Sequence, residues 1–579
     1  MYYVYDPYIG VLLDGKTYGV HFIINFIKLG VITTCYVIMC VQLMRMAFRA
    51  GKQMKLSYQV KPSSAEMLSP FVWVFLFLTV YFLSWHQKKI RSLPPGPFAW
   101  PLFGNLVQIA LANWNGQSLV QWYEQCKREY GNVYTVWVGP MPVVMVVDFD
   151  LIQETFVKNG EAHNGRQKAY VFTGYRDNMG LIWTDGPAWQ EQRRFSLRVL
   201  RDFEFGRNIM QLRILEEIGC QFDELDAQIE STFDKRLEFN PAPFLDVLVG
   251  SVINKILVGY RYDESNIDEL RRMKGGMDKQ WDALTAIDMV FFGEFTSKLP
   301  FFSKRFDLVA YPSFEIIEHF RELIGKRIET INNGTYIIHE SLGAEDYIDA
   351  YLIEMKRREA NGEDMGFFNE QRMAANLLDL YFGGTETSIT SILWAFLFML
   401  HKPEIQDRLR AEVFQTTRGD RFVEITDKAN MPYANAVVAE ILRCSNIVSF
   451  NILRETTEKS VVGDYFIPKG TVIAPQVSVT MRDESVFEDP LEFNPNRFLD
   501  PLKGKQLEKK VIPFSIGKRA CLGESLARAE IFLVITNFVQ RFKFSTLPGQ
   551  QPPSIQPISL ATNLNRVRPY RMVVEKVKH

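Results

Sequence analysis

The stretch that decides the fold of this chain is Phe514-Ser-Ile-Gly517-Lys518-Arg519-Ala-Cys521-Leu522-Gly523. An apolar helical pattern follows from Leu522 to Phe542, so the sulfur of Cys521 is expected at a helix N-terminus. The helix dipole and the free N–H groups there favour a thiolate over a thiol. A lone cysteine is more often a buried structural thiol. The residues around this one argue against that reading.

The other marked residues of the stretch fit a cofactor site. Gly517 permits a sharp turn, and Gly523 leaves room for a flat cofactor to approach the backbone. Phe514 can shield the sulfur, and Arg519 can pair with a carboxylate on the ligand. We therefore predict that these four residues bind the cofactor together with Cys521.

Composition narrows the class of protein. The 579 residues include 66 basic and 67 acidic ones, for a net charge of −1. No overall field favours nucleic acid, and we expect no nucleic-acid partner. The six cysteines lack zinc-type spacing and are too sparse for a disulfide framework, which favours a reducing compartment.

The marked stretch resembles the haem-binding signature F-x-x-G-x-R-x-C-x-G of the cytochrome P-450 superfamily. The resemblance implies a mainly α fold with a smaller β portion and haem b (iron protoporphyrin IX) as the cofactor. It also implies that Cys521 is the axial iron ligand, whose thiolate pushes electron density toward the iron and favours O–O cleavage. The stretch from Arg201 to Arg207 looks like that of arthropod microsomal members.

Two segments resemble the family's contacts with the haem propionates. Trp189 and Arg193 follow Asp185-Gly-Pro, an N-cap candidate with proline in the first turn, and match the motif W-x-x-x-R. Four residues apart, they share a helix face. Arg454 occupies the place of a further propionate ligand, although Leu453 replaces the usual proline. By resemblance, all three bind the cofactor.

A long helix is predicted from Asn369 to Leu400, ending before Pro403. Its middle reads Gly-Gly-Thr-Glu386-Thr387, and two adjacent glycines cost a helix about 1 kcal/mol each relative to alanine. The resemblance is to the family's oxygen-activation motif G-G-x-[DE]-T. It implies that Glu386 and Thr387 are catalytic and relay protons to dioxygen. A glycine-rich packing contact is the alternative reading of the same pattern.

Another set of residues is predicted to be structural. Glu440 and Arg443 form E-x-x-R in a helix that starts near Pro432, and the segment F-N-P-N-R-F places Arg497 downstream. The resemblance implies a Glu–Arg–Arg network that fixes the loop of Cys521.

The N-terminal part predicts a membrane anchor. Leu68 to Trp85 is an uncharged run of 18 residues, about the minimum for a spanning helix. The basic residues that follow would keep that end in the cytosol. We expect an extension of doubtful status at 1–66, with Met67 as the working start, and an anchor at 67–86. A proline-rich hinge at 87–99 and one haem-thiolate catalytic domain at 100–579 would follow.

These features predict a monooxygenase that inserts one oxygen atom from O2 into a lipophilic substrate. No flavin- or NADPH-binding motif is present, so electrons would come from NADPH–cytochrome P-450 reductase, assisted in some family members by cytochrome b5. The catalytic domain would face the cytosol on a single-pass anchor in the endoplasmic reticulum membrane. Two alternatives stay open: a haem-thiolate isomerase or dehydratase without an external reductase, and a non-catalytic haem- or lipid-binding membrane protein.

Overall fold

The computed structural model describes residues 4–6, 11–13, 77, 80–81, 84–206, 209–338, 343–449, 451–558 and 564–577. The extension predicted at 1–66, the start predicted at Met67 and most of the anchor predicted at 67–86 lie outside these residues. Residues 84–91 are helical. The chain divides into two compact units: the first comprises Met1–Val144, Val461–Ile467 and Ser559–Ala561, and the second comprises the remainder.

The first unit holds short helices and strand pairs. Helix α4 begins with a capping box, in which the Ser118 hydroxyl accepts from the N–H of Gln121 and the Gln121 side chain accepts from the N–H of Ser118. Strand β3 is buried along its whole length. The elements are β1 (Val4–Asp6), β2 (Val11–Leu13), α3 (Leu106–Trp114), α4 (Leu119–Tyr130), β3 (Val133–Val138), β4 (Met141–Val146, whose last two residues belong to the second unit), β8 (Ser460–Val462, whose first residue belongs to the second unit) and β9 (Tyr465–Ile467).

The second unit is mainly helical, in agreement with the predicted fold class. Its helices are α5 (Phe149–Gln153), η2 (Glu154–Lys158), α6 (Tyr170–Thr173), α7 (Gly186–Arg201), η3 (Asp202–Gly206), α8 (Ile209–Ser231), α9 (Pro241–Val258), α10 (Ile267–Ala283), α11 (Ala286–Phe291), η4 (Thr296–Lys298), α12 (Pro300–Asn332), α13 (Tyr347–Ala360), α14 (Glu370–His401), α15 (Pro403–Thr417), η5 (Ile425–Asn430), α16 (Pro432–Ser445), α17 (Val477–Thr480), η6 (Pro495–Phe498), α18 (Gly504–Glu508), η7 (Gly517–Arg519) and α19 (Glu524–Arg541).

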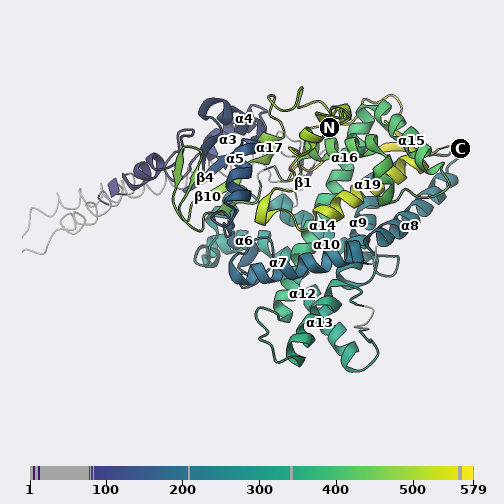
Figure 1. Cartoon of the computed structure of the whole chain (residues 1–579), viewed down its shortest axis with the longest axis horizontal. Coiled ribbons are helices and arrows are strands. Elements are labelled where there is room, and N and C mark those ends of the chain that lie inside the picture. Colours follow the sequence, from purple (N-terminus) through teal and green to yellow (C-terminus); the bar gives the residue numbers. More distant parts are fainter. Residues whose placement is uncertain are drawn as a thin grey trace, which may run out of the picture. The chain divides into compact units, whose positions relative to one another are not determined.

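Helix α14 is the element against which much of the second unit packs. It begins after Asn369, whose side chain accepts from the N–H of Arg372, and ends before Pro403, which confirms the predicted span to within a residue. Helices α9, α12, α16 and α19 all contact it (Figure 1). Because α14 also carries Glu386 and Thr387, the core of the unit fixes their positions.

Two small antiparallel sheets complete the second unit. In the order β11 (Phe542–Ser545), β12 (Met572–Lys576) and β6 (Arg236–Phe239), the C-terminal strand lies in the middle. Strands β10 (Val472–Pro475), β7 (Arg454–Glu455) and β5 (Gly165–Arg166) are also neighbours. The register places Arg454 opposite both Ile473 and Arg166.

Among the described helices, α9 alone is long and apolar enough to cross a membrane. However, 67% of it is buried inside the protein. Its Ile253 side chain fits against Gly384 of α14, where an added Cβ would lie 2.7 Å from Cδ1 of Ile253. Helix α9 is therefore a core helix, and one of the two adjacent glycines of α14 serves packing.

Candidate haem-binding site

The loop of Cys521 is held in one conformation by its backbone. Gly517 has a φ of +71°, and a Cβ at that position would lie 1.9 Å from the carbonyl oxygen of Phe156. Only glycine fits there, as the sequence predicted. The N–H of Cys521 donates to the carbonyl of Phe514 over 2.9 Å. Apart from its two chain neighbours, no described residue has an atom within 4 Å of a Cβ added at Gly523, so the backbone is approachable at that side.

The thiol of Cys521 is accessible although protein surrounds it densely. Burial raises its pKa, opposed by the N–H of Gly523 and the charge of Arg193. Helix α19 begins at Glu524 with Gly523 as its N-cap, so Cys521 lies just before the helix rather than in its first turn. A metal cation removes the proton of a ligating thiol outright, so a bound metal would hold Cys521 as the thiolate.

Four arginines gather around this loop: Arg166, Arg193, Arg454 and Arg519. The register of β5 and β7 sets Arg166 directly opposite Arg454, and like charges at such positions destabilise a sheet. Arg454 Nη2 donates to the Ser515 hydroxyl at 2.9 Å and to the Ile516 carbonyl at 2.7 Å. These neutral partners do not offset its charge.

Arg519 is buried beside the other arginines of this group. Burial and the neighbouring arginines lower its pKa to about 7, and burial and Arg193 lower that of Arg166 to about 9. Asp185 is the carboxylate that opposes both shifts. It occupies the N-cap position of α7, as expected, but its carboxylate accepts from the N–H of Arg166 rather than capping the helix.

Two guanidinium nitrogens of the group have no partner within the part of the chain that the structure describes. They are Nη2 of Arg519 and Nε of Arg166. Arg519 donates its other hydrogens to the carbonyls of Asn164 and Thr184 at 2.7 and 2.8 Å. A buried donor without an acceptor costs about 1–3 kcal/mol, so these two donors suit a ligand that carries carboxylate oxygens.

Trp189 supports the cluster rather than offering a free donor. Its indole N–H donates to the Leu181 carbonyl at 3.1 Å, and its ring lies under Arg519, 3.4 Å from the guanidinium carbon. Arg193, one turn along α7, donates to the carbonyl of Ala520. The pair Trp189 and Arg193 thus contacts the cysteine loop from one helix face.

Glu386 and Thr387 point into different surroundings. Thr387 Oγ1 donates to the Gly383 carbonyl at 2.6 Å. Beyond the local helix backbone, a Cβ added at Gly383 would meet no atom of the described residues within 4 Å. Glu386 is buried and forms ion pairs with Lys274 at 3.2 Å and with Arg566 at 3.1 Å. The acid and the alcohol are therefore not hydrogen-bonded to each other.

The ion pairs of Glu386 belong to a larger charged cluster. Lys274 also pairs with Asp278 at 2.6 Å, and Arg566 pairs with Asp278 at 2.8 Å. Burial and the nearby acids raise the pKa of Asp246 to about 6, although the charge of Lys274 opposes them. Sequence reasoning missed Lys274 and Arg566, because they lie on elements far from α14 in the chain and belong to no motif.

The predicted Glu–Arg–Arg set meets in the interior. Arg443 binds both carboxylate oxygens of Glu440, at 2.7 and 2.8 Å, and Arg497 Nε reaches Glu440 at 3.0 Å. The N–H of Asn494 donates to the same carboxylate at 2.9 Å. Both Glu440 and Arg443 are fully buried.

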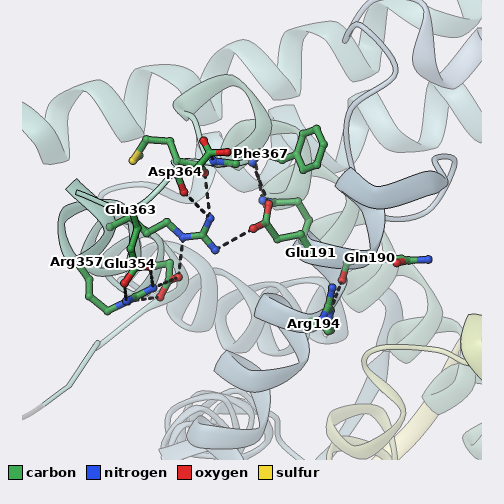
Figure 2. A network of polar contacts seen from close by, with 12 residues as sticks. Gln190, Glu191, Arg194, Glu354, Arg357, Glu363, Asp364 and Phe367 are labelled. Carbon is green, nitrogen blue, oxygen red and sulfur yellow. Dashed lines mark hydrogen bonds and ion pairs between the residues drawn. The ribbon is translucent and has the colours of Figure 1, made fainter. Parts of the chain in front are cut away.

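The basic residues near the cysteine loop and on α7 are mostly exposed, Lys510 being half-buried. Figure 2 shows Arg194 beside Gln190, to whose carbonyl it donates over 3.3 Å. Arg198 pairs with Glu354 at 3.2 Å, so part of its charge is offset. The set comprises Arg194, Arg198, Arg201, Lys503, Lys505, Lys509, Lys510 and Lys518.

Comparison with known proteins identifies the family of this chain. The family model described as cytochrome P-450 matches residues 94–570. A probable cytochrome P-450, cyp-35D1 of Caenorhabditis elegans, is 34% identical over 460 residues, which cover 79% of this chain and 89% of that protein. Cytochrome P-450 2B4 of Oryctolagus cuniculus is 32% identical over 80% of this chain and 89% of its own length. Cytochrome P-450 2D26 of Mus musculus is 31% identical over 83% and 94%. Members of this family are haem-containing oxidoreductases, and this chain belongs to the cytochrome P-450 family.

Proposed function

We propose that this protein inserts one oxygen atom into a lipophilic substrate, with Cys521 as the axial ligand of haem b and electrons from an NADPH-dependent flavin reductase. One observation carries the proposal. Four arginines surround an accessible cysteine, and Nη2 of Arg519 and Nε of Arg166 have no partner among the described residues. Haem b, the cofactor of the family, carries two carboxylates and needs one axial ligand, which fits this arrangement.

The residues present can hold that group. Arg166, Arg193, Arg454 and Arg519 would bind the propionates, with charge-assisted hydrogen bonds that neutral partners cannot replace. The Trp189 ring would keep the guanidinium plane of Arg519 in place by stacking against it. Gly523 would let the ring approach the backbone. When bound, a thiolate-ligated haem activates dioxygen with two electrons and two protons, transferring one oxygen atom and releasing the other as water.

Proton delivery is assigned to the protein. Thr387 Oγ1 donates to a backbone carbonyl, which leaves its oxygen lone pairs free to accept a proton-donating partner. Glu386 would supply protons from the charged cluster, and release from Lys274 or Arg566 would allow its carboxylate to turn. In such a relay the acid, Glu386, would transfer its proton only after its side chain turns toward the hydroxyl of Thr387.

An apolar cluster supports a lipophilic substrate. Its fully buried members come from α6, α11, α12 and their flanks, and partly buried aromatic rings pack against them. Phe172 stacks on Trp183 with the ring centroids 4.4 Å apart. The cluster comprises Ala169, Val171, Phe172, Leu284, Met289, Phe292, Val309 and Ala310, with Tyr175, Trp183, Trp281, Ala283, Phe302 and Phe306 around it.

Membrane association and the redox partner complete the proposal. The uncharged run at 68–85, followed by basic residues, supports a single anchor in the endoplasmic reticulum membrane with the catalytic domain in the cytosol. The exposed basic residues around Arg194 suit an acidic reductase surface, and cytochrome b5 would compete for them. Arg194→Glu should slow reduction at low salt, whereas Lys543→Glu, an exposed control on β11, should not.

The test of the function uses the full chain with a flavin reductase and NADPH. We expect a haem spectrum of the thiolate type with carbon monoxide, and product that carries one atom from labelled dioxygen. Cys521→Ser should lose the thiolate-type spectrum. If the protein instead converts a peroxide without NADPH, and forms no oxygenated product when reductase and NADPH are supplied, it is an isomerase or dehydratase. Well-folded protein without any haem spectrum would overturn the proposal.

A further inference from the structure

A buried ion pair joins α14 to the segment between α6 and α7. Arg176 Nη1 lies 2.7 Å from Asp379 Oδ1, and both side chains are buried. Asp379 Oδ2 also accepts the backbone N–H groups of Leu181 at 2.6 Å and Ile182 at 2.9 Å. The carboxylate of Asp379 is thus fully used.

The guanidinium group of Arg176, by contrast, is not fully hydrogen-bonded. Arg176 is only 1% exposed, yet its Nε and Nη2 have no hydrogen-bond partner in the described part of the chain. A buried donor that finds no acceptor costs free energy, and natural proteins contain few of them. An acceptor from a ligand would satisfy both donors at once, since they form one edge of a planar fork.

The backbone around the pair is shaped to hold it. Asp177 and Asn178 adopt left-handed φ angles of 49° and 55°, which aspartate and asparagine tolerate better than other non-glycine residues. Gly180 has a φ of +113°, and a Cβ there would lie 2.5 Å from Asp379 Oδ2. Glycine at position 180 therefore leaves room for the carboxylate of Asp379 beside this turn.

The pair lies beside the apolar cluster. Tyr175 and Trp183, on either side of it in the chain, both pack against that cluster. Asp379 precedes Thr387 by eight residues on α14, which is about 12 Å along a helix, a little over two turns. A molecule that reached from Arg176 to the neighbourhood of Thr387 would therefore be elongated and would pass the apolar cluster.

We propose that the free N–H groups of Arg176 bind a carbonyl oxygen at one end of an elongated lipophilic substrate, which sets the position that reacts at the other end. This inference rests on the proposed monooxygenase function and specifies its substrate class. Asp379 already neutralises Arg176, so a neutral carbonyl of an ester or ketone suits the site. A carboxylate would bring a second negative charge next to Asp379 in a poorly solvated place.

The test is a titration of the full-length, haem-loaded protein, followed by the spin-state shift of the Soret band. The probes are methyl laurate, laurate and dodecane. We expect methyl laurate to bind about tenfold more tightly than dodecane, the size of a hydrogen bond to a charged group, and more tightly than laurate. An equal response to the ester and the hydrocarbon, or tighter binding of laurate, would overturn the assignment.

Two variants distinguish loss of the Arg176 N–H donors from loss of the folded structure. R176M/D379N removes both charges, while the amide oxygen at 379 can still accept from Leu181 and Ile182. R176K keeps the ion pair but loses the fork. Each should bring methyl laurate to within about twofold of dodecane while leaving dodecane binding unchanged. An ester preference that survives in both variants refutes the role of Arg176, whereas absence of any haem spectrum in the natural chain refutes the proposed function itself.

Discussion

The guanidinium carbon of Arg519 lies 3.4 Å from the centroid of the Trp189 ring, and the indole N–H is already committed to the carbonyl of Leu181. Trp189 is therefore a platform that holds Arg519 flat, with one guanidinium nitrogen left for a ligand. A desolvated cation–π contact contributes about 0.5–2 kcal/mol.

The stacking predicts a graded loss of haem. Trp189→Leu removes the aromatic face and should weaken haem retention by roughly 2- to 30-fold, in line with the free energy of such a contact. Trp189→Phe keeps a face and should lose less. The rate of haem transfer to an excess of apomyoglobin measures the effect. Equal rates for the two variants would show that the ring does not act through stacking.

The Glu440 network predicts failure to assemble rather than slower turnover. Glu440→Ala leaves Arg443 buried without its carboxylate, and breaking a buried pair in this way costs about 3–5 kcal/mol. We expect little or no haem-containing protein. Asp407→Ala is the control, because its pair with Arg410 is 63% exposed on the aspartate side and should contribute at most about 1 kcal/mol. Haem content per protein and the thermal midpoint distinguish the two.

Motifs on single elements were predictable, whereas contacts between elements were not. The helix spans around Glu386 and Glu440 follow from apolar periodicity and from Pro403 and Pro432, and the structure reproduces them. Arg166 escaped notice because it sits in a two-residue strand without a motif, and only the register with Arg454 reveals its role. Asp185 has the right residue type for a cap, but a competing backbone N–H takes its carboxylate.

A buried glutamate, Glu530, links helices α14 and α19. Ser388 donates to Glu530 at 2.7 Å, and burial raises the pKa of Glu530 to about 8. The folded protein therefore holds a proton that the unfolded chain releases near 4.5. Because the unfolded state binds fewer protons in this window, stability should fall as the pH rises from about 4.5 to 8 and level off above, by an amount on the order of 5 kcal/mol.

Glu530→Gln should remove this part of the pH dependence, because glutamine is neutral at every pH in the window. Thermal unfolding of the natural chain and the variant, followed between these pH values, measures the difference. Ser388→Ala should extend the loss to higher pH, since the serine donor lowers the pKa of Glu530. If stability changes with pH in the same way in all three proteins, Glu530 is ionised in the folded protein.

The charged cluster around Glu386 predicts a variant that binds normally but works slowly. Glu386→Gln keeps the shape of the side chain but cannot carry a proton, so product formation should fall by about 10²–10⁴, the usual contribution of a general acid. Substrate affinity should change little, because Glu386 points toward Lys274 and Arg566. Asp282→Asn is the matched control, since Asp282 also pairs with Arg566 but is 58% exposed. Single-turnover product formation measures the rate, and the Soret titration measures substrate affinity. A fall in affinity as large as the fall in rate would show that Glu386 maintains the structure of the site and does not deliver protons.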